Sequence, residues 1–164
     1  HYVMVGSIMF AFFGGLHYWW PKMFGKMYNE FMGKLGAVLI FLGFNVTFFP
    51  QFVMGSRGMP RRYANYLPEF QELHQVSTVG AFILGIGVAV GVWTLFSSIF
   101  LGKKAPDNPW GGTSMEWETA TPPIEHNFHD TPSVKPVYDF SPLVYNEATG
   151  NWDRIAEESG DNHG

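Results

Sequence analysis

Three long stretches without a charged side chain constrain this chain more than any other feature. They cover about residues 1–21, 35–56 and 75–101. A helix needs roughly 20 apolar residues to cross the hydrocarbon core of a bilayer. These stretches are apolar on every face, which is typical of membrane helices and not of amphipathic surface helices. The sequence therefore predicts an all-α membrane protein with three transmembrane helices inside residues 1–104.

Glycines recur throughout these stretches, and Gly87 and Gly91 have the spacing of small-residue helix packing. Three helices form a thin bundle for so many small faces, so we expect them to belong to a larger helical bundle. The chain also begins at His1, in what reads as the interior of an apolar helix. We therefore expect the carboxy-terminal portion of a longer protein.

Residues 105–164 have a different composition, rich in Pro, Asp, Asn, Gly, Thr and Glu. Such a segment favours an extended, irregular tail with little regular structure of its own. His126 and His129 lie three apart without a surrounding carboxylate or cysteine pattern, so no metal site is predicted there. The chain has no cysteine, which excludes disulfides, thiolate zinc sites and iron-sulfur ligation by this chain.

The charges are distributed unevenly and indicate an orientation in the membrane. The first loop and the segment after the third stretch hold Lys22, Lys26, Lys34, Lys103 and Lys104, whereas the second loop holds Arg57, Arg61 and Arg62. The positive-inside rule then places the tail on the cytoplasmic side. No basic patch suggests a nucleic-acid partner.

The second loop contains the turn Gly58-Met59-Pro60-Arg61-Arg62-Tyr63. Two cations about 6 Å apart repel by about 0.7 kcal/mol in water and by about 3 kcal/mol at a protein-lined interface. An anion with several carboxylates, such as a haem with its propionates, would relieve this repulsion because guanidinium groups bind carboxylates bidentately. The alternative is that Arg61 and Arg62 are solvated charges that face lipid headgroups.

Three segments together resemble the last three membrane helices of subunit I of the haem-copper oxidases, most closely the bacterial cytochrome c oxidases. The segments are His1-Tyr2-Val3-Met4 with residues 11–21 (AFFGGLHYWWP), residues 43–51 (GFNVTFFPQ) and residues 58–63 (GMPRRY). This resemblance covers about residues 1–104. The tail motifs NPW (108–110), MEW (115–117) and PP (122–123) are similar to the cytoplasmic extension of bacterial members.

The resemblance implies site residues. The family has a His-Phe-His-Tyr run whose first histidine binds the high-spin haem and whose second binds the low-spin haem. His1 aligns with the second, so it is expected to be an axial ligand of the low-spin haem iron. Arg61 and Arg62 align with the pair that binds haem propionates. Asn65 stands where the family commonly has Asp, and no catalytic residue of the family falls in this chain.

The resemblance also implies a function. The complete enzyme would be a respiratory terminal oxidase that takes electrons from cytochrome c, reduces dioxygen to water and translocates protons. Its cofactors would be a low-spin haem, a high-spin haem and copper. Its partners would be the rest of subunit I, subunits II and III, cytochrome c and membrane lipid. A bacterial plasma membrane is favoured over the mitochondrial inner membrane.

Two alternative functions remain open. One is subunit I of a quinol oxidase, and the other is a non-enzymatic accessory subunit or transporter fragment. Asn45 and Thr47 lie at membrane depth and are expected to form interhelical hydrogen bonds in preference to contacting a haem. His17 is expected at the membrane interface, and no catalytic role is predicted for His74.

Overall fold

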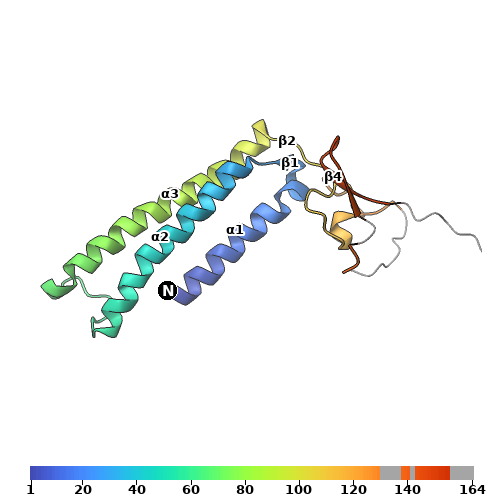
Figure 1. The fold of residues 1–164 in the computed structure, drawn as a ribbon. Coiled ribbons are helices and arrows are strands. Elements are labelled where there is room, and N and C mark those ends of the chain that lie inside the picture. The colour runs from blue at the N-terminus through green and yellow to red at the C-terminus, as the bar shows by residue number, and fades with distance from the viewer. Residues whose placement is uncertain (130–137, 141–142, 156–164) are drawn as a thin grey trace, which may run out of the picture. The chain divides into compact units, whose positions relative to one another are not determined.

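A computed structural model describes residues 1–129, 138–140 and 143–155. These residues form two compact units (Figure 1). The helix unit comprises His1–Tyr18 and Tyr28–Gly102, and the tail unit comprises Trp19–Met27 with the residues from Lys103 onward. The tail predicted for 105–164 lies partly outside the described residues, at 130–137, 141–142 and 156–164.

Three long α-helices dominate the chain. They are α1 (Tyr2–Phe24), α2 (Glu30–Ser56) and α3 (Gln71–Leu101), and a 3-10 turn, η1 (Pro68–Phe70), leads into α3. Asn29 caps α2, because its side-chain oxygen accepts a hydrogen bond of 3.1 Å from the backbone N–H of Met32. All three helices are long and apolar enough to cross a membrane. The predicted fold class of three membrane helices in an all-α protein is therefore confirmed.

Helices α2 and α3 lie side by side along most of their length (Figure 1). Glycines make this approach possible. Gly43 faces the backbone of Leu84, and a Cβ at Gly87 would lie only 2.6 Å from the backbone nitrogen of Ile40. Such backbone contact through small residues is a usual way for helices to associate in a membrane.

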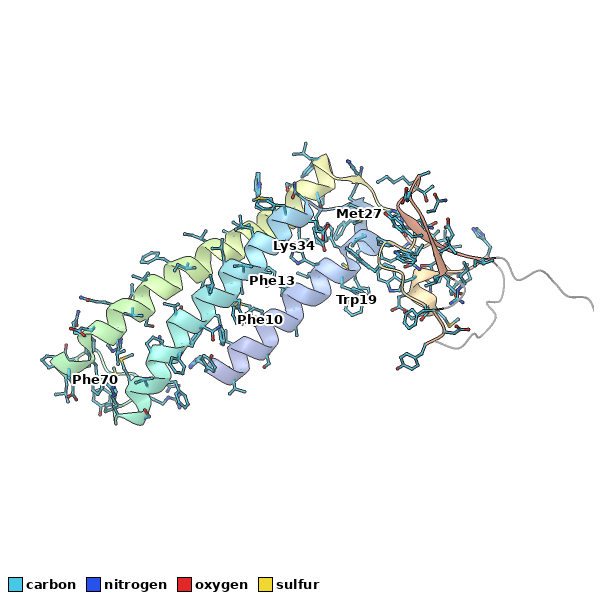
Figure 2. The ribbon with its side chains drawn as sticks, viewed as in Figure 1. Phe10, Phe13, Trp19, Met27, Lys34 and Phe70 are labelled. Carbon is cyan, nitrogen blue, oxygen red and sulfur yellow. The ribbon has the colours of Figure 1, made fainter. Side chains whose placement is uncertain are left out.

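Helix α1 contacts α2 through aromatic rings, among them the ring of Phe10 (Figure 2). Gly6 of α1 also lies against the ring of Phe44. The ring of Phe10 lies 6.2 Å from that of Phe41 and 5.6 Å from that of Phe44. Near the start of α1, the Tyr2 hydroxyl donates a 2.6 Å hydrogen bond to Oδ1 of Asn45. The interhelical hydrogen bond predicted for Asn45 is thus confirmed.

The prediction for the Thr47 side chain was wrong. Its hydroxyl donates to the carbonyl oxygen of Gly43, one turn earlier in the same helix, at 2.6 Å. Gly80 of α3 packs directly against Thr47, and a helical threonine hydroxyl commonly bonds the carbonyl one turn earlier. The interhelical link at this height is made by Ser77, whose Oγ donates to the Thr47 carbonyl at 2.8 Å and accepts from Nε2 of Gln51 at 2.9 Å.

The tail unit begins with a short antiparallel pair. Strand β1 (Lys26–Met27) follows α1 and pairs with β2 (Lys103–Lys104), which follows α3. Lys22, in the last turn of α1, is buried among residues of the tail. Its ammonium donates to the carbonyl oxygens of Asp107 and Thr119, each at 2.8 Å, and to Oγ1 of Thr121 at 2.9 Å.

A hairpin completes the described tail. It consists of β3 (Leu143–Asn146) and β4 (Asn151–Arg154), and the sequence did not predict it. The N–H of Trp152 donates to the carbonyl of Asn108 at 3.0 Å. A second 3-10 turn, η2 (Met115–Trp117), places Trp117 in the interior, where only 2% of its surface is exposed. The tail unit therefore has a small core of its own.

Candidate functional site

A cavity of about 760 Å³ lies in the helix unit, where the start of α1 and the end of α2 meet the loop that leads to α3. Its volume is within the usual range of cofactor pockets, about 300–1,000 Å³. The polar side chains that line it are those of His1, Tyr2, Gln51, Arg61, Arg62, Tyr63 and His74. The structure thus brings together all three site residues that the resemblance implied, although about sixty positions separate His1 from Arg61 and Arg62.

His1 stands immediately before α1, and its carbonyl oxygen accepts the first helical hydrogen bond, 2.9 Å from the N–H of Val5. Its imidazole ring is nearly parallel to the ring of Phe48 on α2, with 6.3 Å between centroids and 8° between planes. Histidine nitrogen is a common protein ligand of haem iron. Helix α2 therefore orients a side chain with the right chemistry at the wall of the cavity.

The arginine loop, residues 57–67, follows α2 directly. Gly58 has φ +89°, a conformation that glycine adopts without penalty. Arg62 has φ +61°, which side chains other than glycine rarely adopt and which costs roughly 1–2 kcal/mol. Backbone conformations of this kind are concentrated at ligand-binding sites.

The two guanidinium groups have no anionic partner within the described part of the chain. The ion pairs found there are Glu30 with Lys34 and Glu118 with Arg154. Arginine stays charged, and its planar fork matches carboxylates. Two unpaired cations and an imidazole at one cavity are a donor set that fits a haem with its propionates.

His74, for which no catalytic role was predicted, also lines this cavity. Its Nε2 atom is buried and has no hydrogen-bond partner among the residues that the structure describes. The ring packs on Tyr66, with 4.1 Å between centroids. A single histidine near the start of an apolar helix carries no sequence signal that distinguishes it from a packing residue.

A second cavity of about 380 Å³ lies in the helix unit near His17. The Nδ1 atom of His17 is 2.8 Å from the carbonyl oxygen of Phe13, and the ring meets Tyr28 edge to face at 4.9 Å. Burial raises the pKa of the Tyr28 hydroxyl, and the nearby Glu30 carboxylate raises the pKa further. His17 is half-buried at this position.

The family model described as cytochrome c and quinol oxidase polypeptide I matches residues 1–83. This chain belongs to that family. The predicted membership is therefore confirmed, and the family match includes His1, the arginine loop and His74. The description of the family covers both cytochrome c and quinol oxidases.

Named relatives extend the similarity. The chain is 46% identical to the probable cytochrome c oxidase subunit 1-beta of Nocardia farcinica over 139 residues, which is 82% of this chain and 24% of the relative. It is 46% identical to cytochrome c oxidase subunit 1 of Synechocystis sp. over 132 residues, which is 80% of this chain and 24% of the relative. For the Bacillus sp. PS3 cytochrome c oxidase subunit 1 the identity is 44% over 138 residues, 82% of this chain and 22% of the relative.

The chain spans about a quarter of the length of these oxidase subunits. Each alignment is longer than the membrane-helix portion of this chain, so the similarity to oxidase subunits continues into the tail. Together with the three membrane helices, family membership identifies a multi-pass membrane protein of the haem-copper oxidase type.

Proposed function

We propose that this chain is part of the catalytic subunit of a respiratory terminal oxidase. The complete enzyme would take electrons from cytochrome c, reduce dioxygen to water and couple the reaction to proton translocation. The observation that carries the proposal is the single cavity at which His1, Arg61 and Arg62 meet in a member of the oxidase family. The names of the relatives, all cytochrome c oxidase subunits, support cytochrome c as the electron donor.

In this proposal each residue has a separate role at a low-spin haem. His1, whose ring lies parallel to that of Phe48, would be a ligand of the haem iron. Arg61 and Arg62 would bind the propionates through charge-assisted hydrogen bonds. When bound, the haem supplies a one-electron iron couple. Positive charge next to the propionates favours the reduced form, because the added electron then enters a site whose carboxylates are already neutralised.

The remaining parts of the enzyme lie outside this chain. They would be the other helices of subunit I with the high-spin haem and copper, and subunits II and III. Residues 1–104 would hold the membrane helices, and residues 105–164 would form a cytoplasmic tail of an enzyme in a bacterial plasma membrane, in preference to a mitochondrial inner membrane. The excess of lysines before α2 and after α3 supports this orientation.

A spectroelectrochemical titration of the complete oxidase tests the proposal. Arg61→Gln or Arg62→Gln should lower the midpoint potential of the low-spin haem by about 60 mV, a tenfold change in the ratio of reduced to oxidised haem. Arg57→Gln is the matched control, since Arg57 belongs to the same loop but not to the cavity of His1. Potentials that stay unchanged in both cavity variants would contradict the proposed site.

A quinol donor is the second candidate, because the family description includes quinol oxidases. Turnover of the purified complex with reduced cytochrome c and with a quinol separates the two donors. A copper-binding cupredoxin domain in subunit II would favour cytochrome c. A complex whose reduced-minus-oxidised spectrum lacks haem bands would instead favour the non-enzymatic alternative.

A further inference from the structure

The buried Nε2 atom of His74 is the starting point. It has no hydrogen-bond partner among the described residues, and it belongs to a side chain that lines the same cavity as Arg61 and Arg62. A buried polar atom without a partner costs about 1–3 kcal/mol, so such atoms are rare in folded proteins and need an explanation.

The neighbours of His74 hold its imidazole ring in place, but none of them forms a hydrogen bond with Nε2. Tyr66 packs on the imidazole face at 4.1 Å with 36° between the rings, while its hydroxyl donates to Oε1 of Gln71 at 2.9 Å. The backbone of His74 belongs to the first turns of α3, where its carbonyl accepts from Oγ1 of Thr78 at 2.8 Å. The imidazole is therefore held in place at the cavity wall.

The polar groups nearby indicate what the missing partner is. Arg61 and Arg62 have donors only, so they cannot accept a hydrogen bond from an Nε2–H group. The neutral acceptors on the lining are Oε1 of Gln51 and the hydroxyl oxygens of Tyr2 and Tyr63, and none of them forms a hydrogen bond with Nε2 of His74. The residues that line the cavity include two cations and no carboxylate, so the cavity lacks an anionic acceptor. A carboxylate meets this requirement.

We propose that His74 donates a hydrogen bond from Nε2 to the carboxylate group that Arg61 and Arg62 bind. This inference rests on the proposed function, in which that carboxylate is a propionate of the low-spin haem. His74 is then a third carboxylate-binding residue beside the arginine pair, and His1 binds the iron. It adds a donor on α3 to the two donors on the loop, so that the start of α3 and the arginine loop hold the same group.

Two substitutions at His74 in the complete oxidase separate hydrogen bonding from packing. His74→Phe keeps a ring against Tyr66 but removes the donor, and His74→Gln keeps a donor close to the position of Nε2. With full haem content, His74→Phe should lower the ratio of reduced to oxidised low-spin haem about threefold at a fixed potential. This corresponds to about 28 mV, since tenfold is 59 mV for one electron. His74→Gln should restore most of the ratio.

Infrared redox-difference spectra provide a readout that a packing defect would not give. The propionate carboxylate bands should shift in His74→Phe and return toward their original frequencies in His74→Gln. If His74→Phe prevents assembly, His74→Asn replaces it, because an asparagine amide reaches the position of Nδ1 but not that of Nε2. Unchanged potentials and carboxylate bands in a donor-free variant with full haem content would overturn the inference.

The arginine variants distinguish the two levels of the proposal. If Arg62→Gln lowers the midpoint potential and the His74 variants leave it unchanged, the hydrogen bond from His74 is overturned and the haem assignment stands. If substitutions of Arg61, Arg62 and His74 all leave the potential unchanged, both proposals are overturned.

Discussion

The helix unit and the tail unit are stabilised in different ways. In the helix unit, α2 and α3 touch through glycine backbones, and α1 adds a layer of aromatic rings. In the tail unit, one buried ammonium satisfies three oxygens, and a hairpin hydrogen-bonds to the segment after β2. The first kind of packing follows from residue size and apolar character. The second depends on particular polar partners that are far apart in the sequence.

The largest effect should come from filling the contact between α2 and α3. Gly43→Ala places a Cβ against the backbone of Leu84, and a backbone cannot rotate away as a side chain can. We therefore expect the free energy of unfolding to fall by about 3 kcal/mol. Gly85→Ala is the matched control in α3, because no described atom lies within 4 Å of a Cβ there. Thermal melting of the purified oxidase, followed by haem absorbance, measures both. Equal melting temperatures for the two variants would argue against close glycine packing.

Loss of the buried ammonium should affect the tail unit next. Lys22→Met leaves the carbonyls of Asp107 and Thr119 without their donor, at a cost of roughly 2 kcal/mol. Hydrogen exchange of residues 105–121 should then accelerate, while the midpoint potential of the low-spin haem stays the same. Lys103→Met, which removes an exposed charge, is the control. Equal exchange in both variants would show that Lys22 does not hold the tail.

A smaller effect is expected from the ion pair between Glu118 and Arg154. Oε1 of Glu118 and Nη2 of Arg154 are 2.8 Å apart, and the side chains are only 26% and 18% exposed, respectively. A double-mutant cycle with Glu118→Gln and Arg154→Met should give a coupling energy of about 1 kcal/mol between the two side chains. The pair Glu30 and Lys34, which is 71% and 73% exposed at the same distance, should give only about 0.3 kcal/mol. A larger coupling energy for Glu30 and Lys34 than for Glu118 and Arg154 would contradict the greater burial of the second pair.

The smallest effect concerns Tyr28 and alkaline pH. Because burial and then Glu30 raise the pKa of its hydroxyl, the folded protein keeps this proton to a higher pH than the unfolded chain does. The stability contributed by this proton is therefore lost as the pH rises above the ordinary tyrosine value of 10.0. Tyr28→Phe should flatten the fall in melting temperature between about pH 9 and about pH 11. Parallel curves for the two proteins would contradict the shift.

The difference between the helix unit and the tail unit also explains which features could be predicted from the sequence. The helices could be predicted because long apolar stretches have few alternatives in a membrane. The three proposed site residues, His1, Arg61 and Arg62, could be named because the family has a recognisable pattern around His1 and around the arginine turn. Lys22 reads as an ordinary interfacial lysine, and its partners lie 85 to 99 positions away. The contacts of Lys22 and the position of His74 at the cavity depend on how distant segments pack, which local patterns do not encode.

The proposed iron ligand can be tested most directly by replacing His1 in the complete oxidase. We expect His1→Ala to abolish the optical and electron paramagnetic resonance signals of the six-coordinate low-spin haem, while Arg57→Gln and Lys22→Met retain them. An unchanged low-spin haem signal in assembled His1→Ala oxidase would contradict the assignment of this cavity as the haem site.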